Sequence, residues 1–234
     1  MPVSGPQSAM PSTADRADAG IVFDLDETLV NRRGSLDGYA ERLRAHYRNY
    51  TSLDSDAFNA LFHELDGNGR VPRQTFFERL SKRAFRDLSA DQIASHFQAF
   101  AWVSPLLFDD VIEVLERFRK QGFAIGVVTN GGSHSQNAKL RNSGLIDCVD
   151  AFVISEEFGA KKPDPSIYRE IAARLGINVE RSWFVGDDPI SDVVGPATAG
   201  FRTAWIDRYL PWPEGQEKVY QQVLTHVSEL EVDG

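Results

Sequence analysis

The chain has 234 residues, of which 42% are hydrophobic and 25% are charged, a composition typical of a globular protein and not of a fibrous or disordered one. A net charge of -9 would repel a nucleic-acid backbone, so a small ligand is favoured over nucleic acid. No apolar run is long enough to span a bilayer, and the single cysteine, Cys148, excludes an intramolecular disulfide. We therefore expect a cytoplasmic protein without membrane association. The sequence carries no signal of its oligomeric state.

The first recognisable element follows a polar start. Residues 1–19 are rich in Pro, Ser, Ala and Asp and lack an apolar segment, which predicts a flexible leader and not a signal peptide. Apolar residues 21–23 then run into Asp24 and Asp26, a pattern that predicts a buried parallel strand ending in a charged loop. Taken alone, the Asp-x-Asp pair is equally compatible with a solvated turn. If the pair lies at a sheet edge, its repulsion requires a divalent cation or a shared proton.

Residues 34–104 show helical periodicity and no strand pattern. After a first amphipathic helix, further helices are predicted to start near Asp54, at Pro72 and after Ser89. The apolar residues expected to face inward in the fourth helix are Ile93, Phe97 and Phe100. We therefore expect a small helical lobe inserted after the first strand.

From Pro105 onward, predicted helices alternate with short apolar strands. The strands are expected at residues 123–129, 151–155, 183–186 and 203–206, and a last helix is expected over residues 217–230. Alternating strands and crossover helices imply a parallel sheet with right-handed connections. The predicted fold class is α/β, a Rossmann-like three-layer core built from residues 20–33 and 105–234.

Each of the first four predicted strands ends in polar residues. In chain order these are Asp24 and Asp26; Thr129, Asn130 and Gly131; Lys161 and Lys162; and Asp187 and Asp188, with Asp192 downstream. Because ligands bind at the carboxyl ends of strands in such sheets, we expect these groups to converge. Phosphoryl transfer through an aspartyl phosphate needs such a set: an attacking carboxylate, donors for the phosphoryl oxygens, and cations.

These residues resemble the motifs of the haloacid dehalogenase superfamily, and within it the phosphatases with a helical (C1-type) cap. Asp24, Asp26 and Thr28 match its Asp-x-Asp-x-Thr motif, and Thr129 matches its second motif. Residues 162–165 match Lys-Pro-Asp-Pro, and Asp187 with Asp192 matches the acidic fourth motif. The resemblance covers residues 20 to about 207.

The resemblance implies a role for each matching residue. The catalytic residues would be Asp24 as nucleophile, Asp26 as general acid and base, Thr129, and Lys162, which would orient the nucleophile. Mg²⁺ would be the cofactor, bound by Asp24, the backbone carbonyl of Asp26, and Asp187. Phosphoryl oxygens would be held by Thr129 and by the backbone at Asn130 and Gly131. Asp192 would lie behind these groups; Asp188 is either a second such residue or a surface acid.

Arg73 follows a polar turn, residues 66–71, between two predicted cap helices. In position, this turn corresponds to the part of the cap that approaches the active site in the family, which makes Arg73 a candidate substrate contact; otherwise it is a surface arginine of a first helical turn. The turn also resembles the middle of an EF-hand loop, but Thr75 stands where the closing acid is needed, which disfavours calcium.

The function expected from these motifs is Mg²⁺-dependent hydrolysis of a small phosphorylated metabolite. One alternative is a phosphosugar mutase of the same superfamily, which would return the phosphoryl group to substrate. Another is a non-catalytic regulatory protein that binds phosphorylated metabolites. A dehalogenase is disfavoured, because Asp26 and Asp187 supply an acid/base and a metal ligand that dehalogenases of the family lack.

Overall fold

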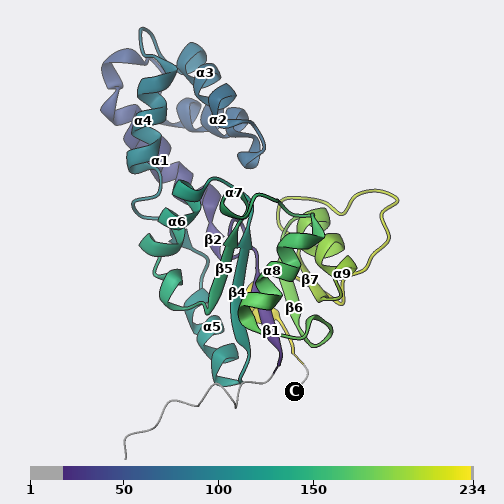
Figure 1. Cartoon of the computed structure of the whole chain (residues 1–234). Helices are drawn as coiled ribbons and strands as arrows, with labels where there is room; N and C mark the ends of the chain where they lie inside the picture. Colours follow the sequence, from purple (N-terminus) through teal and green to yellow (C-terminus); the bar gives the residue numbers. More distant parts are fainter. Residues whose placement is uncertain (1–17, 233–234) are drawn as a thin grey trace, which may run out of the picture.

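The computed structural model describes residues 18–232. Six parallel strands form one sheet in the order β5-β4-β1-β6-β7-β8, with helices on both faces (Figure 1). The strands are β1 (Gly20–Phe23), β4 (Ala124–Thr129), β5 (Ala151–Ile154), β6 (Trp183–Gly186), β7 (Arg202–Ile206) and β8 (Gln222–Leu224). The predicted α/β class with a parallel sheet is confirmed. Nearly all of the predicted leader lies outside the described residues.

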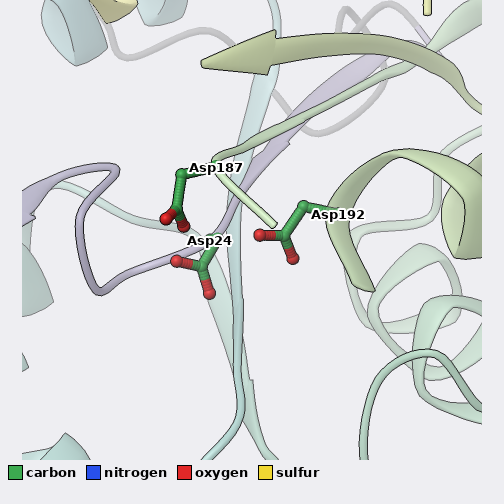
Figure 2. Close-up of side chains that lie close together, drawn as sticks. All are labelled: Asp24, Asp187 and Asp192. Atoms are coloured by element: carbon green, nitrogen blue, oxygen red, sulfur yellow. The ribbon is translucent and has the colours of Figure 1, made fainter. Parts of the chain in front are cut away.

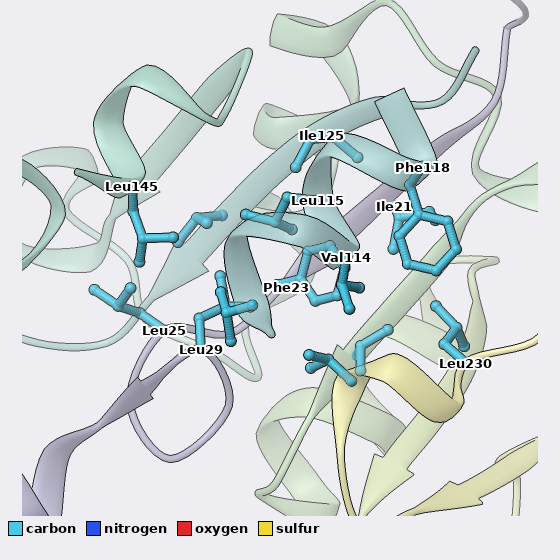
Figure 3. Close-up of a cluster of buried hydrophobic side chains, with 14 of the residues drawn as sticks. Ile21, Phe23, Leu25, Leu29, Val114, Leu115, Phe118, Ile125, Leu145 and Leu230 are labelled. Atoms are coloured by element: carbon cyan, nitrogen blue, oxygen red, sulfur yellow. The ribbon is translucent and has the colours of Figure 1, made fainter. Parts of the chain in front are cut away.

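The sheet is covered on both faces because its central strands are apolar throughout. In β1, Ile21 and Phe23 belong to one hydrophobic cluster, while Val22 belongs to the cluster on the opposite face. Helices α5 (Val111–Lys120) and α6 (Ser133–Asn142) contribute to the first cluster (Figure 3), and α8 (Pro165–Leu175) contributes to the second. This packing fixes the carboxyl ends of the strands at one edge, where the polar residues follow.

Four helices form a helical insert, residues 32–105, at one end of the molecule (Figure 1). They are α1 (Arg32–His46), α2 (Ser55–Asp66), α3 (Arg73–Ala84) and α4 (Ala90–Phe100). The predicted starts are confirmed: Asp54 caps α2, Pro72 precedes α3, and Ser89 forms a capping box with Gln92. The insert has its own hydrophobic cluster, separate from those of the sheet.

A two-stranded antiparallel ribbon joins the insert to the sheet domain. It pairs β2 (Val30–Asn31) with β3 (Leu106–Leu107). The remaining elements are short: α7 (Ser155–Phe158), α9 (Gly195–Thr198), a π-helical turn (Pro189–Val194), and 3₁₀ turns at Arg48–Tyr50, Gly67–Gly69, Leu145–Asp147, Val179–Arg181 and Val227–Glu229. No helix among residues 18–232 is long and apolar enough to cross a bilayer.

Two local predictions are wrong. The helix expected over residues 217–230 is absent; strand β8 and a 3₁₀ turn take its place, because β7 leaves backbone groups at the sheet edge that this segment pairs. The backbone of Gln221 donates to the carbonyl of Thr203, and its side chain accepts from the Thr203 amide. Phe100, expected to face inward, is 48% exposed at the last residue of α4.

Candidate active site

Three buried carboxylates meet where β1 and β6 end. Asp24 directly follows β1, Asp187 follows β6, and Asp192 lies on the π-helical turn after it. One oxygen from each carboxylate lies within 4.8 Å of the other two, and Figure 2 shows the three side chains converging. Gly186 makes this approach possible, since a Cβ there would lie 2.5 Å from the Cβ of Asp192.

Lys162 is the cation of this cluster. Its Nζ donates to Asp24 at 2.5 Å, to Asp192 at 2.7 Å, and to the carbonyl of Val128 at 2.9 Å. Burial acts to lower the pKa of Lys162, but the carboxylates of Asp192 and Asp24 outweigh it and raise the pKa. Lys162 therefore stays charged, and the exposed neighbour Lys161 does not replace it.

Asp187 has no such partner. Within residues 18–232, no group donates a hydrogen bond to its carboxylate, although the side chain is buried. Burial, with the nearby charges of Asp24 and Asp192, raises the pKa of Asp187 to about 9. Burial likewise raises the pKa of Asp24 to about 7, even though Lys162 acts in the opposite direction. Three acids thus share one lysine, and the cluster lacks positive charge.

The end of β4 supplies the predicted phosphate loop. Thr129 is buried and its hydroxyl accepts a hydrogen bond from Gln136, while the amide of Gly131 donates to Ser155 at 3.0 Å. Asn130 bonds the backbone of Lys162 twice, at 2.9 and 3.0 Å. Its side chain therefore fixes the loop that carries the lysine, a contact that the sequence did not reveal.

The carboxylate of Asp26 is bonded to two side chains of α6. Both of its oxygens accept from Nζ of Lys139, at 2.7 and 2.6 Å, and one accepts from Gln136 at 3.1 Å. Burial acts to raise the pKa of Asp26, but Lys139 and Arg32 outweigh it and lower the pKa. Burial in turn lowers the pKa of Lys139 to about 8.

Lys139 was missed by the sequence reasoning. It is buried, and its Nζ lies 4.1 Å from the centre of the Trp102 ring, which comes from the insert. A helix such as α6, with few apolar residues, predicts a solvated lysine. The available signal was that α6 begins at Ser133, with Gly132 as its N-cap, directly after the loop predicted to hold phosphate. The first turns of this helix therefore lie near the strand ends.

A cavity of about 630 Å³ opens above these groups, between the strand ends and the insert. The turn at residues 68–73 lines its insert side, and Arg73 is part of that lining; its contact with substrate stays a prediction. Asp66, which is 1% exposed, holds the turn: it accepts from Arg73 at 2.7 Å, from Arg32 at 2.8 Å, and from the Gly69 amide at 2.9 Å.

Asp188 and Asp192 have definite local partners. Oδ1 of Asp188 accepts from the amides of Ile190 and Ser191, both at 3.0 Å, and so caps the π-helical turn that carries Asp192. Oδ2 of Asp192 accepts from the Asp188 amide at 3.0 Å. The second oxygen of Asp188 pairs with Arg70 of the insert at 3.2 Å.

The sequence profile described as haloacid dehalogenase-like hydrolase matches residues 19–200. The chain belongs to this family. It is 33% identical over 199 residues to a glyceraldehyde 3-phosphate phosphatase of Methanopyrus kandleri, covering 80% of this chain and 83% of the relative. It is 37% identical over 207 residues to a ribulose-1,5-bisphosphate 5-phosphatase of Halopiger xanaduensis, covering 80% and 84% of the two chains.

Solved structures share the fold of this family member. The HAD-hydrolase YfnB of Bacillus subtilis, solved with bound magnesium, superposes with a TM-score of 0.72 at 22% identity, covering 92% of this chain and 97% of the other. A dehalogenase superposes with a TM-score of 0.69 at 20% identity, covering 90% and 94%. The resemblance to a phosphatase of the superfamily, and with it the expectation of a hydrolytic enzyme, is confirmed.

Proposed function

We propose that this phosphatase hydrolyses a small phosphorylated metabolite with Mg²⁺ and through an aspartyl phosphate, an acyl phosphate formed on Asp24. The observation that carries the proposal is the buried carboxylate of Asp187, which has no hydrogen-bond donor among the described residues and faces two further acids across less than 4.8 Å. A buried acid without a partner is costly unless a cation or proton neutralises it.

The residues fit a magnesium ion by the chemistry of their donors. Mg²⁺ takes oxygen ligands and few carboxylates, and Asp24 and Asp187, with the backbone carbonyl of Asp26, offer such a set. Asp192, already bonded to Lys162 and to the Asp188 amide, would support the site from behind. When bound, the ion neutralises negative charge on the phosphoryl group and on the carboxylates.

The proposed reaction assigns one residue to each step. Oδ of Asp24 attacks phosphorus, while Lys162, at 2.5 Å, orients that carboxylate. Asp26 parts from Lys139, takes up a proton from solvent and gives it to the leaving oxygen as the bond between that oxygen and phosphorus breaks. Asp26, ionised again and paired with Lys139, then accepts a proton from the water that attacks phosphorus and releases phosphate from Asp24. Thr129 and the backbone at Asn130 and Gly131 hold the phosphoryl oxygens.

The relatives support the size and class of the substrate. Their names specify phosphatases of glyceraldehyde 3-phosphate and of ribulose 1,5-bisphosphate, both small phosphorylated compounds. A cavity of about 630 Å³ has room for a molecule of that size. The cytoplasmic location stays a prediction.

The test is phosphate release from an aryl phosphate by the purified protein. We expect hydrolysis that requires Mg²⁺, stops with chelator, and is lost in Asp24→Asn, which keeps the shape of residue 24 but removes the nucleophile. Phosphate should appear in equal amount to the substrate consumed. Full activity after rigorous metal removal would overturn the metal assignment, and isomerisation of a sugar phosphate without phosphate release would favour a mutase.

A further inference from the structure

The turn between α2 and α3 is built to hold one arginine in the cavity. Gly67 and Asn68 both have left-handed backbone conformations, with φ of 54° and 53°. The carboxylate of Asp66 fixes the turn through the Gly69 amide, as described above. Arg70 follows directly and lies in the cavity wall opposite the carboxylates of the strand ends. The turn fixes the position of the Arg70 backbone, and the Arg70 side chain is 60% exposed.

Arg70 pairs across the cavity with Asp188, in the ion pair that links the insert to the sheet domain. The contact is 3.2 Å long, and the two side chains are 60% and 30% exposed. Ion pairs this exposed contribute little to stability, so a ligand can displace one. The other oxygen of Asp188 caps the π-helical turn on its own, so the turn is held without Arg70.

The cavity therefore separates two kinds of charge. At the strand ends, six carboxylates line the cavity with three lysines, Lys139, Lys161 and Lys162, so negative charge is in excess where the proposed Mg²⁺ would bind. On the insert side, Arg32 and Arg73 share the single carboxylate of Asp66, which leaves a net positive charge. Arg70 adds a guanidinium whose present partner is weakly held. A phosphoryl group bound at Asp24 would direct its leaving group toward this positive side.

We propose that the preferred substrate carries a second acidic group, a carboxylate or a second phosphate, on the leaving alcohol, and that Arg70 exchanges Asp188 for that group. The inference rests on the proposed phosphatase function and adds the class of substrate. A guanidinium binds either anion through two parallel hydrogen bonds, and an acid that meets it within a cavity gains more than an exposed pair does. Arg70 is then a specificity-determining residue, with Arg73 beside it.

The experiment uses substrate pairs that differ in the second acid. One pair is 3-phosphoglycerate and glycerol 3-phosphate, and the other is fructose 1,6-bisphosphate and fructose 6-phosphate. We expect kcat/KM to be about tenfold or more higher for the acidic member of at least one pair, and the pair that shows this identifies carboxylate or phosphate. Arg70→Ala should reduce the preference to within about threefold, and Arg70→Lys should retain part of it, since the charge remains. Arg79→Ala, at an exposed position of α3 outside the cavity, should leave the preference intact.

A binding measurement separates this inference from the proposed function. Calorimetry with Asp24→Asn, which cannot turn substrate over, should show the acidic member of a pair binding about tenfold tighter, and Asp24→Asn/Arg70→Ala should lose that difference. Equal affinities and equal kcat/KM within both pairs would overturn the inference while leaving a phosphatase in place. A preference that survives Arg70→Ala would also overturn it. Absence of hydrolysis for every phosphate ester would overturn the proposed function, and calorimetry would still decide the inference.

Discussion

Asp66 of the insert and Asp187 of the sheet domain are both buried carboxylates, 1% and 8% exposed, with opposite surroundings. Asp66 accepts from two arginines and a backbone amide. Burial acts to raise its pKa, but Arg32 and Arg73 outweigh it and lower the pKa. Asp187 has no donor to its carboxylate among residues 18–232, and burial raises its pKa to about 9.

The difference separates a structural acid from a functional one. The chain satisfies Asp66 with its own groups, so that residue can only hold the turn in place. Asp187 is kept in a state that costs folding free energy unless something from outside the chain neutralises it. On the proposed function, the carboxylate without a donor lies at the reacting site, and the fully bonded one belongs to the scaffold that faces it.

Removing the one lysine of the three-acid cluster should have the largest effect. Lys162→Met leaves Asp24 and Asp192 buried without their cation, so we expect kcat/KM to fall by about 10³-fold or more. The metal-free protein should lose about 3–5 kcal/mol of unfolding free energy, as when one partner of a buried ion pair is removed. Urea denaturation and phosphate release would measure both. Lys161→Met, at the exposed neighbour, should change kcat/KM by less than about fivefold.

Asp187→Asn should raise the stability of the metal-free protein and lower its activity. The folded-state pKa of about 9 lies above the usual 3.8, so the folded protein retains a proton that the unfolded chain releases, and wild-type stability without metal should fall as pH rises from about 4 to 9. The variant lacks the part of this pH dependence that Asp187 contributes. At pH 8 without metal, its Tm should exceed that of wild type by about 3 °C or more, the shift given by ~1 kcal/mol in a chain of this size.

The same substitution should lower kcat by about 10²-fold or more at low Mg²⁺, because one of few anionic ligands is lost. Mg²⁺ should also raise the Tm of wild type more at pH 8 than at pH 5. If Asp187→Asn has the kcat of wild type at low Mg²⁺, Asp187 is not a metal ligand. The same conclusion follows if Mg²⁺ raises the Tm of wild type equally at pH 5 and pH 8.

Asp66→Asn should shift stability in the opposite direction to Asp187→Asn. The change leaves two arginines without their shared carboxylate, so we expect a loss of about 3 kcal/mol in the free energy of unfolding, with or without Mg²⁺. Urea denaturation measures it, and Glu64→Gln on the same helix, in an exposed ion pair with Arg83, is the matched control with little expected change. A stabilised Asp66→Asn would erase the distinction between the two acids.

Arg73→Ala should have the smallest effect of these substitutions. We expect kcat/KM to fall for the natural substrate and much less for an aryl phosphate. We expect kcat/KM for the best natural substrate to fall by about tenfold or more, ~1.4 kcal/mol, because a charged hydrogen bond to the substrate is lost. An aryl phosphate, which does not reach the insert, should be affected much less. Steady-state kinetics on both substrates decides: equal losses indicate damage through Asp66, and no loss on either places Arg73 away from the substrate.

The sheet and its polar edge could be predicted because each depends on local patterns. An apolar strand followed by a polar residue fixes both the strand and the position of that residue at its end, whichever strands turn out to be its neighbours. That reasoning placed Asp24, Thr129, Lys162 and Asp187 at one edge, and the structure brings them together there. Asp192 joins them through a π-helical turn whose geometry no sequence pattern specified.

The contacts that were missed depend on how the insert packs against the sheet domain. The sequence predicts a solvated Lys139, but in the structure Trp102 of the insert packs against it. The ion pair of Arg70 with Asp188 joins residues that are 118 positions apart. The helix predicted over residues 217–230 is absent for a similar reason: the segment pairs with an open sheet edge, and this pairing overrides its helical periodicity. Tertiary pairing of this kind leaves no periodic signal.

The position of the insert directly after β1 also sets the order in which the chain can fold. In β1, Gly20 pairs with Ala124 and Ile21 with Trp183, so the central strand of the sheet has no neighbour until distant residues have been synthesised. The four helices of the insert contact one another in chain order and carry their own hydrophobic cluster. Local contacts form faster than distant strand pairings. During synthesis, the insert would therefore become compact while Asp24 and Asp26, which precede it, still lack the strands that bring the other site residues to them.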